Sequence, residues 1–594
     1  MERMAMESYC KWELNQTLVK EVRGWLAEGN GKGFDRFKSR LQFGTAGLRA
    51  RMGPGLDRMN TVAVMQATQG VLKHIEEKLG PQNGTSRGIA IAFDSRHNSE
   101  VFAAVTATVC LRRGFKVLFH DTPVPTPILA YTAKLRSTAA AIMITASHNP
   151  KEDNGYKLYG EDACQIIPPN DEAIQKLIEE NFEPWSDYSD ASINSVTSNK
   201  LCSVVTNDVV REYLKEVTQK LHRVASEINS ASPRIVYSAF HGVGAKYVKL
   251  VFEKFRLPEY IPVEEQLLPD PDFPTLGFPN PEEGKGAMEL SISTAEAYGS
   301  NIILANDPDA DRLAVAEKQE NGQWRLFTGN EIGALLGYHL WEVEGQNAPE
   351  GQKFCMVSSA VSSKALGAMA AREGFVFLEA LTGFKWLSHV ALEARSDGIK
   401  PLVTFEEAIG FMLADVVYDK DGLSAAGVAA EMVAQCYQSG MTLSKRLSQF
   451  YDTYGYFIGY NGYRVCSDPS TMRMIFSRLR EYRAGGDIDG TKIHSTRDVG
   501  AGTDTAASDG KSDLPTGGGT DFITLRLSVD LLGTGKPQEA PNLILCYRAS
   551  GTEPKFKFYS ELCCSREEVD GGAHEKLRAI VDSTTEHAVN FTTN

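Results

Sequence analysis

The chain has 594 residues, 42% of them hydrophobic and 23% charged, which is typical of a globular protein with several cores. Its net charge of -14 and pI of about 5.4 argue against a nucleic-acid binder, although a local basic cluster can still bind a phosphorylated ligand. Ten cysteines without a CxxC pair, a polar start and no apolar run of membrane-spanning length predict a cytoplasmic protein with reduced thiols.

Helices and strands alternate through the first third of the chain. Helices are predicted within residues 1–40 and at 59–79 and 99–113, and strands at 88–93, 115–120 and 139–144. Such alternation favours a parallel sheet. Before the second helix, the loop FGTAGLR ends at Arg49. Its glycines and its cation suit an anion, and a plain turn is the alternative.

The run after the strand at 139–144 carries the first group suited to chemistry. Small and polar residues follow the strand abruptly, with Ser147 and His148 at its carboxyl end, where open α/β sheets bind ligands. A serine hydroxyl becomes a nucleophile only when it is activated, and it can also carry a phosphoryl group. A simple Ser/Asn/Pro turn is the alternative. Residues 154–157 are predicted to form a turn, from which Lys157 could point back.

The same alternation begins again twice. Residues 185–205 are polar and predict a linker. Beyond it, helices are predicted at 208–228, 289–298 and 330–344, and strands at 234–240, 301–305, 354–358, 375–379 and 402–405.

The loop after the strand at 301–305 contains the carboxylates Asp307, Asp309 and Asp311. Three alternate carboxylates repel one another, and a hard cation with oxygen ligands, usually Mg²⁺ beside phosphate, relieves the repulsion. An EF-hand loop would need glycine at Arg312 and glutamate at Lys318. A haloacid-dehalogenase-type phosphatase would have a threonine or valine near Asp311. An acidic surface loop is the remaining alternative.

Two further loops suit a sugar phosphate. Glu406 and Glu407 follow a strand and could bind sugar hydroxyls, although a solvated helix start would also favour them. The last part of the chain, from about residue 454, changes character. There the strand at 543–547 opens into the loop RASGTEPKFK, where arginine, hydroxyls, glycine and lysines predict a phosphate cradle.

The motifs TASHNP, DPDADR, FEEAIG and RASGTEP occur in the order found in the α-D-phosphohexomutase superfamily, which the chain resembles. FGTAGLR and LTGFKW are similar to its phosphoglucomutase/phosphopentomutase-type branch. The resemblance implies an α/β fold of four domains, three related mixed α/β domains and a smaller α+β C-terminal domain. The predicted ranges are 1–200, 201–325, 326–453 and 454–594.

The resemblance also implies residue roles. Ser147 would be the phosphoserine, and Asp307, Asp309 and Asp311 would bind Mg²⁺ together with it. His148 and Lys157 both remain open as the acid/base. The implied substrate-binding residues are Arg49, Arg312, Thr382, Gly383, Glu406, Lys420, Arg548, Ser550, Gly551, Thr552 and Lys557.

The implied activity is a mutase that interconverts sugar 1-phosphates with 5- or 6-phosphates of ribose, deoxyribose and glucose. A sugar 1,6- or 1,5-bisphosphate would be intermediate and activator. Ala408 replaces a serine of many hexose mutases, which is compatible with a pentose. The alternatives are a glucose-1,6-bisphosphate synthase with an acyl-phosphate donor, and a non-catalytic sugar-phosphate-binding protein. The predicted partners are small sugar phosphates, without nucleic acid or membrane, and the chain is predicted to be a monomer.

Overall fold

The computed structural model describes residues 2–29, 31–466, 468–488, 491–516, 521–531, 540–550 and 555–589. The chain divides into two compact units, Met1–Gln352 with Phe384–Ser444 and Lys353–Gly383 with Lys445–Asn594. All ten cysteines are free thiols. Over the described ranges, no helix combines the length and the apolar character that crossing a membrane requires.

The first sheet lies in the first unit and has the strand order β1-β5-β4-β2-β3-β6. Its strands are β1 (Leu48–Arg51), β2 (Ile89–Phe93), β3 (Val117–Phe119), β4 (Ala140–Ile144), β5 (Asp153–Tyr159) and β6 (Cys202–Val204). The neighbouring strands β4, β2, β3 and β6 pair in parallel. At the other edge, β5 pairs antiparallel with β4, and β1 pairs antiparallel with β5. The sheet is therefore mixed rather than purely parallel.

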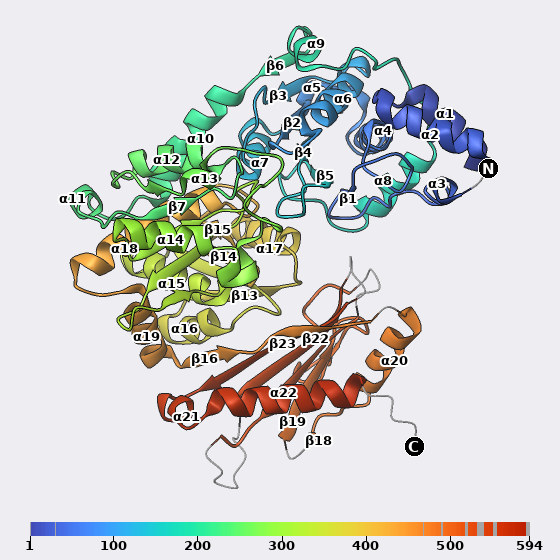
Figure 1. Cartoon of the computed structure of the whole chain (residues 1–594). Helices are drawn as coiled ribbons and strands as arrows, with labels where there is room; N and C mark the ends of the chain where they lie inside the picture. The colour runs from blue at the N-terminus through green and yellow to red at the C-terminus, as the bar shows by residue number, and fades with distance from the viewer. Residues whose placement is uncertain are drawn as a thin grey trace. The chain divides into compact units, whose positions relative to one another are not determined.

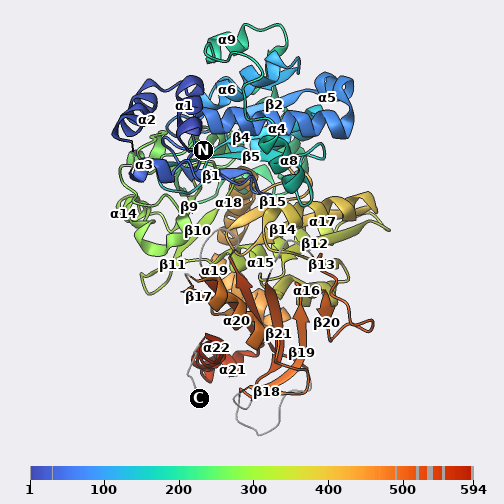
Figure 2. The same cartoon turned by 90° about the vertical axis from the view of Figure 1, so that its right-hand side faces the viewer.

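Helices surround this sheet and shield its buried central strands β2 and β4 (Figures 1 and 2). They are α1 (Glu2–Trp12), α2 (Gln16–Glu28), α3 (Lys32–Asp35), α4 (Thr61–Leu79), α5 (Pro81–Arg87), α6 (Ser99–Arg112), α7 (Thr126–Arg136), α8 (Asn170–Glu179) and α9 (Ile193–Thr197). A continuous apolar core joins α1, α4 and α6 to the strands. The packing of this apolar core holds the strands in place, and with them the loops at their carboxyl ends.

Two sequence-based expectations were wrong in this region. Residues 185–205 are not only a linker, because α9 and β6 form there and β6 extends the sheet by pairing with β3. The expected turn at 154–157 lies inside β5. Gly155 marks a close approach instead of a turn, since an added Cβ would lie 2.6 Å from the carbonyl oxygen of Thr145.

The second sheet, also in the first unit, has the order β11-β10-β9-β7-β8. Its strands are β7 (Val236–Ser238), β8 (Ile261–Pro262), β9 (Ile302–Ala305), β10 (Ala314–Lys318) and β11 (Trp324–Leu326). The helical segments around it are α10 (Thr206–Leu221), α11 (Ser226–Ser230), α12 (Gly244–Lys254), α13 (Glu264–Leu267), η1 (Pro281–Gly286) and α14 (Glu289–Tyr298).

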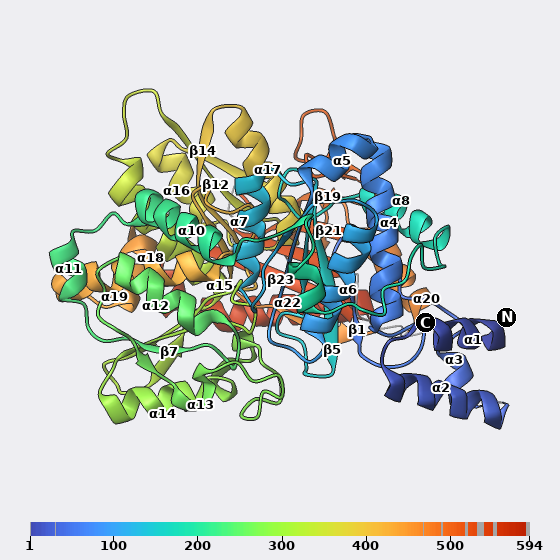
Figure 3. The ribbon, with the colours of Figure 1, turned by 90° about the horizontal axis from the view of Figure 1, so that it is seen from above.

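The remaining elements of the first unit come from the third stretch of alternating helices and strands, which begins at α15 and is called the third repeat below. They are α15 (Gly329–Leu340), η2 (Trp341–Gly345), α17 (Phe384–Ser396), β14 (Ile399–Glu406), β15 (Gly410–Leu413) and α18 (Gly422–Gln438). β14 and β15 form an antiparallel hairpin, and α18 packs against α12 (Figure 3). This packing joins the third repeat to the second.

The second unit is built around an antiparallel sheet with the order β16-β23-β22-β21-β19-β18 and α22 across one face (Figure 1). The strands are β16 (Tyr456–Gly459), β17 (Gly462–Val465), β18 (Asp487–Ile488), β19 (Thr491–Asp498), β20 (Thr503–Asp504), β21 (Phe522–Ser528), β22 (Leu543–Ala549) and β23 (Lys555–Cys564). The helices are α19 (Leu443–Tyr454), α20 (Pro469–Leu479), α21 (Arg566–Asp570) and α22 (Ala573–Val589). The parallel pair β12 (Lys353–Ser359) and β13 (Val376–Ala380), with α16 (Ala365–Glu373), belongs to this unit too.

Candidate active site

Ser147 lies in the loop that follows β4, with only 3% of its surface exposed. Its backbone has a φ of 52°, a left-handed conformation that is unusual for a residue other than glycine. The hydroxyl of Thr145 holds it there, accepting the Ser147 N–H at 2.9 Å and donating to Asp94 Oδ2 at 2.6 Å. A strained and supported residue of this kind is typical of functional sites.

Arg96 clamps this serine loop. Its guanidinium donates to the carbonyl oxygens of Ser147, of Asn149 at 2.6 Å and of Pro150 at 2.9 Å. The side chain is buried and lies 3.4 Å from the carboxylate of Asp94, which balances its charge. Because Asp94 and Arg96 directly follow a strand, the sequence predicted a structural or supporting role for both, and these contacts agree with that prediction.

The three aspartates after β9 gather at the serine hydroxyl. Asp307, Asp309 and Asp311 are buried, and one ligand oxygen of each lies within 4.8 Å of the others. Ala310 between them has a φ of 54°, which turns the loop tightly. The Ser147 hydroxyl donates to Asp307 Oδ2 at 2.9 Å. Two loops more than 150 residues apart in sequence thus meet at a single point.

Two buried ammonium groups face these carboxylates. Lys157, from β5, donates to Asp309 Oδ2 at 2.7 Å and to Asp311 Oδ2 at 3.0 Å. Lys420 Nζ lies 3.4 Å from Asp311 Oδ2 and 3.6 Å from Asp419 Oδ1. Burial opposes the charge of Lys157, but the two aspartates outweigh it and raise its pKa. Lys157 is therefore held as a cation rather than solvated.

The aspartate cluster fits a hard divalent cation. Asp309 Oδ1 and Asp311 Oδ1 are buried, and no hydrogen-bond donor reaches them from the described residues. Burial, and then the two neighbouring aspartates, hold the pKa of Asp307 well above its ordinary value, so the lysines do not fully compensate the charge. Carboxylate oxygens without donors are the ligands that Mg²⁺ prefers.

His148 lies beside the serine hydroxyl, with Nδ1 3.2 Å from Ser147 Oγ. Its ring meets Phe278 edge to face at 6.0 Å. Burial, followed by repulsion from Arg312 and Arg49, holds the pKa of His148 well below its ordinary value. This environment favours the neutral form of the imidazole.

The loop that carries the three aspartates contacts the loop between β14 and β15 directly. Leu313 N donates to the carbonyl oxygen of Ile409 at 3.0 Å, and the backbones of Arg312 and Gly410 form an isolated antiparallel β-bridge. Glu406 is buried at the end of β14. Burial raises its pKa to about 7, although Lys420 opposes the shift. Glu406 thus lies among the cations of the same site.

Arg49 and Arg312 approach from two other loops. Arg49 is exposed and donates to Asn149 Oδ1 at 3.2 Å, beside the serine loop. Arg312 forms an ion pair with Glu282 in η1. Thr126, which sequence reasoning missed, donates to Asp309 Oδ2 at 2.6 Å from the start of α7. A buried threonine opening a helix gives no signal of this role in the sequence.

The other expected phosphate-binding residues belong to the second unit. Thr382 and Gly383 follow β13, while Gly551 and Thr552 lie outside the described residues. The described members of the last loop are Arg548, Ser550 and Lys557. Arg548 and Lys557 are direct partners across β22 and β23. Two cations facing each other on adjacent strands repel, and an anion between them removes that cost.

Comparison with known proteins places the chain in a family. Family models match residues 40–185, 211–322 and 328–454, described as phosphoglucomutase/phosphomannomutase alpha/beta/alpha domains I, II and III. The chain belongs to the phosphoglucomutase/phosphomannomutase family. Its fold is the mixed α/β architecture of that family, with an additional β-rich C-terminal domain.

Curated relatives match over nearly the whole chain. A Homo sapiens protein named phosphopentomutase is 39% identical over 98% of this chain and 94% of its own length. Another, named glucose 1,6-bisphosphate synthase, is 38% identical over 98% and 93%. The crystal structure of the Paramecium phosphoglucomutase parafusin, in an open form, is 16% identical, covers 93% of this chain and 96% of its own, and has a TM-score of 0.62. This last likeness concerns the fold alone.

Proposed function

We propose that the protein is a mutase that interconverts sugar 1-phosphates with 5- or 6-phosphates, acting on ribose, deoxyribose and glucose phosphates. Whole-chain relatives named phosphopentomutase support the reaction and the substrate class. The observation that carries the proposal is the hydrogen bond from the hydroxyl of Ser147, a residue with a left-handed backbone, to a buried cluster of aspartates. A hydroxyl in that position is suited to exchanging a phosphoryl group.

In the proposed reaction, phosphorylated Ser147 donates its phosphoryl group to a hydroxyl of the bound sugar phosphate. The phosphorus–oxygen bond to Ser147 breaks, and a bond from phosphorus to the sugar oxygen forms. The proton of the sugar hydroxyl passes to a base, and Ser147 Oγ takes up a proton to regenerate its hydroxyl. The resulting bisphosphate reorients and returns its other phosphoryl group to Ser147. The protein's main task is to position these groups and to neutralise their charge.

Asp307, Asp309 and Asp311 are the residues that would hold Mg²⁺, together with an oxygen of phosphorylated Ser147. When bound, the ion supplies neutralisation of phosphate charge. Lys157 and Lys420 supply part of the same neutralisation from the protein itself. A sugar 1,6- or 1,5-bisphosphate remains the proposed activator, since it would phosphorylate Ser147 on binding.

The geometry favours His148 over Lys157 as the proton acceptor. His148 is neutral and lies 3.2 Å from Ser147 Oγ. Lys157 is held as an ammonium by two carboxylates and has no lone pair to accept a proton. We therefore assign His148 as the base and Lys157 as a stabiliser of phosphate charge.

The remaining substrate contacts are proposed by loop. Arg49 and Arg312 would bind the transferring phosphate. The sugar or its phosphate would be contacted by Thr382, Gly383, Glu406 and Lys420. The phosphate that does not react would be bound by Arg548, Ser550, Gly551, Thr552 and Lys557. The opposed pair Arg548 and Lys557 supports the last of these assignments.

A substrate panel tests the activity. Ribose, deoxyribose and glucose 1-phosphates are incubated with the protein, Mg²⁺ and a trace of bisphosphate, and the 5- or 6-phosphates are measured. A second arm replaces the trace bisphosphate by an acyl phosphate and measures bisphosphate release, because one relative is named a bisphosphate synthase. Release that greatly exceeds isomerisation would favour the synthase, and no product in either arm would refute both.

Replacing Arg96 by lysine is expected to lower kcat about a hundredfold and to leave KM nearly unchanged. Lysine keeps the charge beside Asp94 but cannot reach three carbonyl oxygens at once, so the serine loop shifts away from the reacting geometry. Steady-state kinetics measure the effect. Arg87→Lys is the matched control, because Arg87 also donates to backbone carbonyls, those of Ser137 and Thr138. A wild-type kcat in Arg96→Lys would contradict the clamp.

The affinity for substrate is expected to fall as pH drops through about 7. Glu406 has a pKa of about 7, so it is ionised above that pH and neutral below it. An ionised carboxylate accepts stronger hydrogen bonds from sugar hydroxyls. KM is measured from about pH 6 to about pH 8, a range that brackets this pKa. Glu406→Gln retains the titration of the substrate phosphate and loses only that of Glu406. Identical pH profiles for the two proteins would contradict the assignment.

A further inference from the structure

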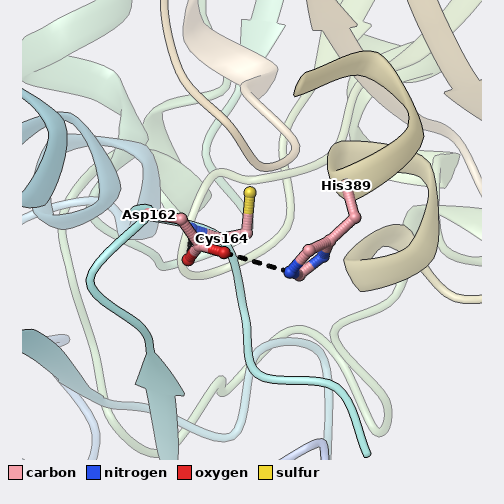
Figure 4. Close-up of side chains that lie close together, drawn as sticks. All are labelled: Asp162, Cys164 and His389. Atoms are coloured by element: carbon pink, nitrogen blue, oxygen red, sulfur yellow. Dashed lines mark hydrogen bonds and ion pairs between the residues drawn. The ribbon is translucent and has the colours of Figure 1, made fainter. Parts of the chain in front are cut away.

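A second group of metal-binding side chains lies outside the proposed active site. Asp162 and Cys164 belong to the segment that follows β5, and His389 projects from α17 toward them (Figure 4). A carboxylate oxygen, the Sγ and a ring nitrogen all lie within 4.8 Å of one another. These three residue types are the common ligands of Zn²⁺.

The chain folds tightly to bring the two ligands of this segment together. Gly160 N donates to the Cys164 carbonyl oxygen at 2.8 Å, and Ala163 between the ligands has a φ of 63°. Cys164 N donates to Asp162 Oδ1 at 3.1 Å. Asp162 Oδ1 thus accepts a backbone hydrogen bond, whereas Asp162 Oδ2 lies 3.1 Å from His389 Nε2.

The orientation of His389 is fixed from outside the cluster. Its Nδ1 lies 2.6 Å from the carbonyl oxygen of Lys385, one turn earlier in α17. A carbonyl oxygen only accepts, so Nδ1 carries a hydrogen and Nε2 faces Asp162. Nε2 can then present either a second proton or a lone pair bound to a cation. A carbonyl behind a histidine is the usual arrangement at metal sites.

Space and access are present as well. A cavity of about 60 Å³ is lined by Asp162 and His389, among others. That volume exceeds what one water molecule needs, so a water in this cavity can lie beside Asp162 and His389. Cys164 is fully buried, whereas the Asp162 side chain is 36% exposed and gives an ion a route from solvent.

We propose that Asp162, Cys164 and His389 form a binding site for a thiophilic divalent metal ion of the Zn²⁺ class. The site is separate from the oxygen-only cluster of Asp307, Asp309 and Asp311, which suits Mg²⁺. Binding requires the Cys164 thiol to release its proton to solvent, and it leaves a thiolate, a neutral imidazole and a carboxylate around the ion.

The site is linked to the proposed active site by a short chain of contacts. Gln165, next to Cys164, donates to Asp419 Oδ2 at 2.8 Å. Asp419 Oδ1 in turn accepts the backbone N–H of Lys420, whose ammonium faces Asp311. These contacts connect the segment of Asp162 and Cys164 to Lys420, to which the proposed mutase reaction assigns a role.

Co²⁺ is the probe that tests the site, because sulfur ligation gives it an intense near-ultraviolet charge-transfer absorption. The full-length reduced protein is titrated with Co²⁺ in excess Mg²⁺, without any sugar phosphate. The wild type is expected to develop the band, and Cys164→Ser to lose it. His389→Gln is expected to bind at least about tenfold more weakly. Cys110→Ser, which alters another buried cysteine, is the control and should keep the band.

Other outcomes would overturn the site. They are a band that survives Cys164→Ser, unchanged affinity in His389→Gln, or no band in the wild type. Melting temperatures of each variant without metal verify that it is folded. Because neither substrate nor turnover enters this titration, its result is independent of the mutase proposal.

Discussion

Replacing Ser147 by alanine is expected to reduce mutase turnover by at least about 10⁴-fold, as removal of a covalent nucleophile does in other enzymes. The hydroxyl is the group that would carry the phosphoryl group, and it lies 2.9 Å from Asp307 Oδ2. Alanine removes only that hydroxyl from a site that Thr145 and Arg96 hold through the backbone, so the loop should keep its fold. Steady-state assays on the best substrate of the panel measure the loss.

A phosphorus label makes the same prediction specific. Wild-type protein incubated with labelled bisphosphate should retain about one label per chain at Ser147, located by peptide mapping. Ser147→Ala should retain none. Ser238→Ala is the matched control, since Ser238 is also a buried serine at a strand end, and its hydroxyl donates to Gln266. Full turnover in Ser147→Ala, or label on another residue, would refute the covalent route.

The positions of strands and helices followed from sequence patterns wherever local rules decide them. The helix predicted at 289–298 is α14 with the same bounds, and the strand at 301–305 is β9 to within one residue. Sequence patterns failed where contacts with a distant part of the chain determine the local structure. Residues 202–204 look like linker but complete a sheet edge, and Gly155 looks like a turn but permits two backbones to approach closely.

The candidate site was only partly predictable, for a related reason. Ser147 and the three aspartates follow buried strands, so their position at a sheet edge could be inferred from periodicity. The burial of Lys157 could not, because its charge is stabilised by Asp309 and Asp311 from a distant loop. Arg96 likewise acts on a loop about 50 residues later. Long-range charge pairing leaves no periodic trace in a sequence.

The predicted domain ranges 1–200, 201–325, 326–453 and 454–594 remain predictions. The family models cover residues 40–185, 211–322 and 328–454, and compactness instead separates Lys353–Gly383 from the rest of the third repeat. Residue roles also remain proposals, above all those of Gly551 and Thr552. Recognition of the family rested on four motifs in order, and this recognition was confirmed.

Replacing Lys157 by methionine is expected to lower the melting temperature of the metal-free protein by roughly 5 °C. Lys157 is the buried cation closest to Asp309 and Asp311, and removing one partner of a buried charge cluster costs about 3–5 kcal/mol. Lys151→Met is the matched control, because Lys151 and its partner Asp272 are both exposed and such surface ion pairs contribute little to stability. Thermal unfolding in the presence of a chelator measures both.

Mg²⁺ should then restore more stability to the Lys157→Met protein than to the wild type. The methionine variant leaves the aspartates with less positive charge, so a divalent ion at those oxygens gains more by binding, and its stabilisation follows from binding to the folded state. Lys151→Met should respond to Mg²⁺ as the wild type does. If Mg²⁺ raised the melting temperature of all three proteins equally, the lysine and the ion would not share the carboxylates. The metal site would then have to lie away from Asp309 and Asp311.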